Sequence, residues 1–159
     1  MLVSTLILTA LTGCSHADER PCLLINAPKG IGVTINSAIA ERIDTAELTL
    51  CWDSSCQPRP VGLRSGSKIA GDGCTGSGAD AVCVARSEPT DEEVGFLDLP
   101  NLPSSPVEVT VIVTDLAGTR IVDQTLMLDS RTVDSPGECG GRPQGWITVD
   151  ADGWARAAG

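Results

Sequence analysis

Short runs in which apolar and polar residues alternate, separated by glycine, proline, asparagine and aspartate, make up most of the chain after residue 22. The clearest run is 107–114, where valine at every second position alternates with Glu, Thr and Ile. An alternation of period two predicts a β-strand with one apolar face. The next segment, Asp115 to Gly118, predicts a hairpin turn because glycine adopts positive φ readily. Residues 120–128 then predict the returning antiparallel strand.

Further strands follow from the same pattern, and only residues 37–43 suggest a single turn of helix. About eight short strands separated by turn residues predict an all-β fold, an antiparallel, immunoglobulin-like β-sandwich with little or no helix. Besides the hairpin above, we expect strands over residues 31–35, 46–52, 61–63, 81–85, 146–150 and 154–156.

One sandwich domain is expected over residues 22–159, with Leu50, Val109, Val111 and Val113 in its core. Among the bulky side chains, we expect Trp52 and Trp146 to be buried and Trp154 to be partly exposed. Proline cannot donate to a strand ladder, so Pro58 and Pro60 suit an edge strand or a turn.

Polar stretches between these runs predict surface loops. Residues 64–80 are rich in glycine, 87–93 are acidic and contain proline, and 130–144 contain Cys139. Because scaffold domains usually recognise partners through loops, 64–80 and 130–144 are the expected contact surfaces.

The first 13 residues carry no charged side chain and resemble the apolar region of a secretory signal peptide. They are too short to span a bilayer as a helix, which needs about 20 residues. The ending Leu11-Thr12-Gly13-Cys14 resembles the lipobox of bacterial lipoproteins. That resemblance implies transfer of a diacylglyceryl group to the Cys14 thiol, cleavage before Cys14 and a tether over 14–21 that holds the domain at the membrane. The chain departs from the pattern because no Lys or Arg precedes the apolar stretch. An ordinary cleaved signal, or a stub with a chance cysteine, is the alternative.

Seven cysteines are present, an odd number that needs explaining in an exported protein. If Cys14 is lipidated, six remain for three disulfides. Six cysteines allow many pairings, and closeness along the chain favours Cys51–Cys56 and Cys74–Cys83, which leaves Cys22–Cys139. The alternative is a redox dithiol at Cys51 and Cys56, although four residues separate them rather than the two of thioredoxin-type motifs.

Charge and composition exclude several function classes. The net charge of −10 argues against nucleic acid as the main ligand, since polyanion binding needs clustered cations. The single histidine, His16, lies in the tether, so the domain lacks the histidine of a Ser-His-Asp triad. Zinc and copper sites are disfavoured for the same reason, and because the cysteines are expected in disulfides. No cofactor, metal or catalytic residue is therefore expected.

Three short motifs match known patterns without the context that those patterns need. Residues 71–76 fit G-x-G-x-x-G but lack a flanking strand and helix, and 65–68 fit S-x-x-K without its companion motifs. Residues 150–153, Asp-Ala-Asp-Gly, look like part of a calcium loop but have too few ligands, so a hairpin turn is favoured. The acidic stretch 91–93 with Asp98 could bind a cation weakly, although a solvated loop is the default.

From Cys22 onward the layout resembles a set of actinobacterial lipoproteins. The matching features are an early cysteine, a strand ending in Cys51 with Cys56 after it, a Val/Thr-rich strand with a D-x-x-G turn, and Cys139-Gly-Gly before a terminal hairpin. The segment holding Cys74 and Cys83 departs from that layout. The hairpin over 107–128 is similar to those of immunoglobulin-like, fibronectin-like and carboxypeptidase-regulatory-like sandwiches. Fold similarity does not supply a function.

These observations favour a non-catalytic domain, lipid-anchored on the extracytoplasmic face of the cell membrane, that binds or helps to assemble an envelope protein or polymer. An extracytoplasmic enzyme is one alternative: a thiol–disulfide exchanger using Cys51 and Cys56, or a hydrolase using carboxylates such as Asp53 and Asp98. A carrier of a small ligand or cation is another.

Overall fold

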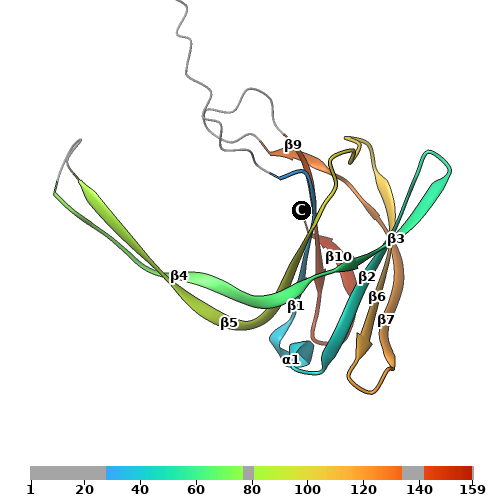
Figure 1. Ribbon diagram of the computed structural model, residues 1–159, viewed down its shortest axis with the longest axis horizontal. Helices are drawn as coiled ribbons and strands as arrows, with labels where there is room; N and C mark the ends of the chain where they lie inside the picture. The colour runs from blue at the N-terminus through green and yellow to red at the C-terminus, as the bar shows by residue number, and fades with distance from the viewer. Residues whose placement is uncertain (1–27, 77–80, 134–141, 159) are drawn as a thin grey trace, which may run out of the picture.

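The computed structural model describes residues 28–76, 81–133 and 142–158, which form a two-sheet β-sandwich and a long two-stranded arm (Figure 1). In these residues ten strands and one helical turn follow in this order: β1 Gly30–Ile35, α1 Ser37–Ala40, β2 Ile43–Trp52, β3 Ser55–Val61, β4 Leu63–Thr75, β5 Val82–Asp98, β6 Val107–Asp115, β7 Arg120–Leu128, β8 Arg131–Val133, β9 Arg142–Val149 and β10 Ala155–Ala158.

Two sheets face each other. The large sheet has the order β10-β9-β1-β5-β4, with β8 also pairing with β9, and the small sheet has the order β3-β2-β6-β7. Neighbouring strands are antiparallel except β1 and β9, which are parallel. The sequence prediction of a disulfide-linked all-β sandwich is confirmed, with this one parallel pair added. A parallel pair is possible here because β1 and β9 are far apart in the chain and no tight turn has to join them.

The core is the apolar contact between the two sheets. Alternate residues of β1 and β9 from the large sheet meet alternate residues of β2, β6 and β7 from the small sheet. No polar or charged side chain is buried among the described residues. Full burial of a Val, Leu or Ile side chain contributes roughly 1.5–3 kcal/mol, so this contact is the main source of stability. Its fully buried members include Ile31, Val33, Ile35, Leu48, Val109, Val111, Val113, Ile147 and Val149.

Two hairpin turns share one construction. Asp115 Oδ1 accepts hydrogen bonds from the backbone N–H groups of Ala117 and Thr119, and Gly118 follows at φ 78°. Asp150 Oδ1 accepts the equivalent bonds from Asp152 and Trp154, and Gly153 has φ 80°. Side-chain bonds to the following backbone are typical of aspartate in turns. The 150–153 segment is therefore the hairpin turn that the sequence favours over a calcium loop.

Both edges of the small sheet carry features that hinder pairing with another strand, and the sequence predicts one of them. Pro58 and Pro60 lie on β3, an edge of the small sheet, as expected. At the other edge, the Gln124 side chain on β7 donates to the carbonyl of Gly153 and accepts from the N–H of Ala155. These bonds attach β7 to the beginning of β10, in the other sheet.

Three predicted loops are largely strand. Residues 64–75 lie in β4, 87–93 lie in β5, and the described parts of 130–144 include β8 and the start of β9. The loop predictions are wrong for these residues. Residues 67–69 and 82–89 are exposed, and a strand that is solvated on both faces needs no alternation of apolar and polar residues. Backbone pairing, which sequence polarity does not report, sets the conformation there.

Trp146 is 45% exposed, so the expectation that it is buried is wrong. Its ring lies on the outer face of the large sheet, directly over Gly32 of the neighbouring strand, and a Cβ atom at Gly32 would overlap it. Phe96 flanks the same glycine on β5, with its ring centroid 6.2 Å from that of Trp146. The missing side chain at Gly32 thus provides the space that an aromatic pair fills.

Replacing Gly32 with alanine is expected to lower the free energy of unfolding by about 1–3 kcal/mol, because the added methyl displaces the Trp146 ring. Chemical denaturation measures this change. Gly62→Ala is the matched control, since a Cβ atom there meets no atom within 4 Å, and its effect is expected to be below about 0.5 kcal/mol. In a Trp146→Ala background the cost of Gly32→Ala should shrink, and an unchanged cost would contradict this account.

Candidate functional site

The arm is one candidate site. Strand β1 pairs with β5 only over Glu93–Asp98, whereas β5 continues back to Val82. The arm consists of residues 67–75 of β4 and 82–90 of β5, paired only with each other in the described structure. Figure 1 shows it projecting well beyond the sandwich and curving to one side.

Apolar side chains are exposed on both faces of the arm. Val84 lies opposite Gly73, and Val82 lies opposite Thr75, on one face. Val84 is 60% exposed and Val82 is 63% exposed. Ile69, which pairs with Ser87 and therefore lies on the other face, is 73% exposed. No described side chain of the arm belongs to the buried core cluster. A short ribbon with exposed apolar residues and free backbone edges is a surface that another chain can pair with.

A disulfide joins Cys74 to Cys83 near the end of the arm, in directly opposed positions. The pairing predicted from sequence is confirmed. An isolated two-stranded hairpin is marginally stable in water. The covalent link holds the two strands in register where the core cannot.

The second predicted local disulfide, Cys51–Cys56, is also present and closes the hairpin between β2 and β3. The two turn residues, Asp53 and Ser54, both have positive φ, at 49° and 62°. Two-residue hairpin turns with positive φ at both positions usually contain Asn-Gly or Asp-Gly, so Asp53 suits the first position, whereas Ser54 stands where glycine is favoured. The disulfide, one residue pair away from the turn, fixes a hairpin in which Ser54 occupies an unfavourable conformation.

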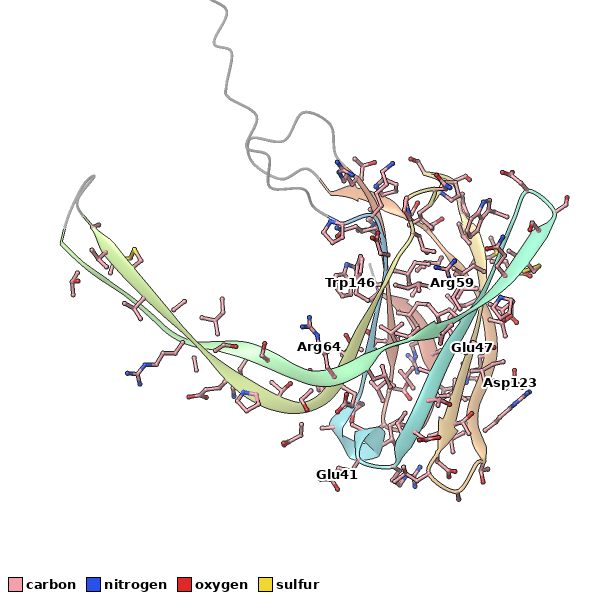
Figure 2. The ribbon with its side chains drawn as sticks, viewed as in Figure 1. Glu41, Glu47, Arg59, Arg64, Asp123 and Trp146 are labelled. Atoms are coloured by element: carbon pink, nitrogen blue, oxygen red, sulfur yellow. A yellow bond between two sulfur atoms is a disulfide. The ribbon has the colours of Figure 1, made fainter. Side chains whose placement is uncertain are left out.

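A pocket of about 290 Å³ is the second candidate site. It lies between the β2–β3 hairpin and the turn that follows β5. Trp52, Gln57 and Arg59 line it from the hairpin, and Asp98, Leu99 and Asn101 line it from the end of β5 and the turn. Figure 2 shows Arg59 projecting from β3 toward the end of β5. Trp52 is partly buried and packs against the core, so the expectation that it is buried is confirmed in part.

The carboxylates suggested for a hydrolase are in different places. Asp98 lines this pocket, whereas Asp53 is an exposed residue of the β2–β3 turn and does not. The exchanger alternative places its chemistry on Cys51 and Cys56, which are disulfide-bonded here, and it stays a prediction.

The remaining sequence-predicted site residues lie outside the described residues. They are Cys14, the lipidation candidate, His16 of the tether, and the proposed pair Cys22 and Cys139. The lipobox and the third disulfide therefore stay predictions.

Within residues 28–76, 81–133 and 142–158, no group of three or more His, Cys, Asp and Glu side chains is arranged to hold a metal ion. Over the same residues, no helix has the length and apolar character needed to cross a membrane. No known protein family, curated protein or solved structure matches the chain.

Replacing Cys74 and Cys83 together with serine is expected to loosen the arm while leaving the sandwich intact. Because the arm contributes no side chain to the core, the global free energy of unfolding should change by less than about 0.5 kcal/mol. Hydrogen exchange should accelerate over 67–75 and 82–90 only. The matched pair Cys51→Ser and Cys56→Ser acts on a hairpin of the sandwich and should cost about 2 kcal/mol. Equal global losses in the two variants would show that the arm unfolds together with the body.

Proposed function

We propose that this protein is a non-catalytic, lipid-anchored module on the extracytoplasmic face of the cell membrane, which binds or helps to assemble an envelope protein through the β4–β5 arm. The observation that carries the proposal is the arm itself: a stapled ribbon outside the core that adds nothing to the packing of the domain. An element that the fold does not need for its own stability is suited to contact with another molecule.

Two features support the location. Disulfides persist in oxidising compartments and are rare in the cytosol, and two are present in the described residues. The segment Leu11-Thr12-Gly13-Cys14 resembles a lipobox, and stable anchoring of such proteins requires more than one acyl chain. An immunoglobulin-like sandwich of the actinobacterial lipoprotein kind is the family that we propose for this arrangement.

A protein partner fits the arm better than a polymer of sugars. β4 is a 13-residue edge strand without proline in its sequence, so it offers an extended row of backbone donors and acceptors. Strand addition at such an edge gives affinity through main-chain hydrogen bonds, and neighbouring side chains give specificity. Ile69, Val82 and Val84 are the exposed apolar residues available for that second role.

The anchor is tested with Cys14→Ala in the native host. The protein with its native Cys14 should fractionate with membranes and carry the added mass of a diacylglyceryl group, and the variant should move to the soluble extracytoplasmic fraction. Loss of the acyl chains removes roughly 0.8 kcal/mol of membrane affinity for each buried CH₂ group. A variant that still fractionates with membranes would overturn the lipid anchor.

The arm is tested with a photo-crosslinking amino acid at Val84 or Ile69 in intact cells. Both positions should give a discrete adduct with the same exported protein, since they lie on one ribbon. Glu47 is the control position because it lies on β2 of the small sheet, which Figure 2 shows on the sandwich away from the arm, and it should give no such adduct. Adducts at Glu47 equal to those at Val84, or no adduct at either arm position, would contradict a role for the arm in binding.

A further inference from the structure

A disulfide and two prolines restrict the conformation of the β2–β3 hairpin. The Cys51–Cys56 disulfide closes it, and Pro58 and Pro60 fix φ at two positions on its outer strand. The same seven-residue strand carries Gln57 and Arg59, two lining residues of the 290 Å³ pocket. Rigid support of binding groups reduces the entropy lost when a ligand binds.

Strand register places the exposed residues Gln57 and Arg59 on the face of the small sheet that forms the core elsewhere. Gln57 lies opposite Leu50 and Arg59 lies opposite Leu48, and both leucines point into the core. Residues directly opposite each other in an antiparallel pair share one face of the sheet. The polar side chains therefore lie on the inner face of β3, at the place where the pocket separates it from the end of β5. The inner face of β3 becomes apolar and buried only at Val61, which is 7% exposed.

The apolar part of the pocket is fixed in position. Trp52 packs against the core cluster, and Leu99 is 5% exposed. The indole of Trp52 and the Leu99 side chain provide a firm apolar wall at a site that is otherwise polar.

The polar part of the pocket is chemically mixed and available. Arg59 supplies guanidinium donors, Asp98 supplies carboxylate acceptors, and the amides of Gln57 and Asn101 supply both. Among the described residues, no hydrogen bond or ion pair joins the side chains of Arg59 and Asp98 to each other or to another group. One positive and one negative charge give the site no net charge, which disfavours a simple anion or cation as ligand.

We propose that this pocket binds one neutral sugar ring of a saccharide. A sugar ring has an apolar C–H face that packs on an indole, and hydroxyl groups around its rim that both donate and accept hydrogen bonds. A wall formed by Trp52 with a guanidinium, a carboxylate and two amides around it matches both features. Ligand pockets usually measure about 300–1,000 Å³, so a pocket at the lower limit holds one ring rather than a longer chain.

This inference rests on the proposed role as a binding module and adds a ligand class at a second place. The arm and the pocket are made of different residues. Each can therefore fail alone in an experiment.

The test uses the disulfide-bonded protein and a panel of neutral sugars: glucose, galactose, mannose, arabinose, N-acetylglucosamine and their β-linked disaccharides. The chain has three tryptophans, so an NMR spectrum contains three indole N–H signals with internal controls. At least one sugar should shift the Trp52 signal and leave those of Trp146 and Trp154 unchanged. Asp98→Asn and Arg59→Gln should each weaken that sugar's binding by about tenfold, as expected for a hydrogen bond to a charged group.

Asp44→Asn and Arg42→Gln are the matched controls, since both residues are exposed and neither lines the pocket. They should leave the dissociation constant unchanged within about twofold. Cys74→Ser with Cys83→Ser should also leave sugar binding unchanged, which separates this result from failure of the arm. The proposal is overturned if no sugar of the panel shifts the Trp52 signal, or if Asp98→Asn and Arg59→Gln bind as the unmodified protein does. A Trp52 shift with the zwitterion alanyl-alanine and none with any sugar overturns it too, and would assign Arg59 and Asp98 to the termini of a peptide.

Discussion

The apolar contact between the two sheets is the constraint on which the rest of the structure depends. Successive side chains of a strand point to opposite faces of the sheet, so each residue that enters this contact leaves its two neighbours on the outer face. Elements that take part in the contact, such as β1, β2, β6 and β9, gain their stability from it. The arm lies outside the contact and therefore relies on its own backbone pairing and on Cys74–Cys83. The domain is thus divided into a part that the core stabilises and a part that a covalent bond stabilises.

Sequence patterns predict most of the strands whose alternate side chains form the core, together with their turns and the two local disulfides. The valine alternation of β6, the turn at Asp115, the terminal hairpin and the two local disulfides follow from residue type and spacing alone. Within the arm, the sequence predicts the strand over 81–85 and the Cys74–Cys83 link, but it predicts a loop where β4 lies. A ribbon solvated on both faces shows no period of two, so the rest of the arm gives no strand signal. Trp146 was misplaced because its site depends on Gly32, a residue far away in the chain that provides space on the outer face.

The pocket could have been found from the sequence by one more step. Pairing Cys51 with Cys56 fixes the register of the hairpin, which places Gln57 opposite Leu50 and Arg59 opposite Leu48. Once those leucines are assigned to the core, two polar residues on the core face of a strand are an anomaly. Their partners Asp98 and Asn101 could not be found in this way, because only the packing of one sheet on the other brings the end of β5 to the hairpin.

The two disulfides do similar mechanical work with different consequences. Each joins directly opposed residues of a hairpin, and each compensates for sequence that favours the strand poorly: positive φ at Asp53 and Ser54 in one hairpin, glycine and polar residues in the other. On the β2–β3 hairpin, which packs on the sandwich, the link fixes inner-face side chains around a concave site. On the arm, which packs on nothing described, the link holds open an extended edge. A hairpin pressed against a core presents a pocket, and a hairpin beyond the core presents its backbone, so the position of each hairpin relative to the core decides what its disulfide preorganises.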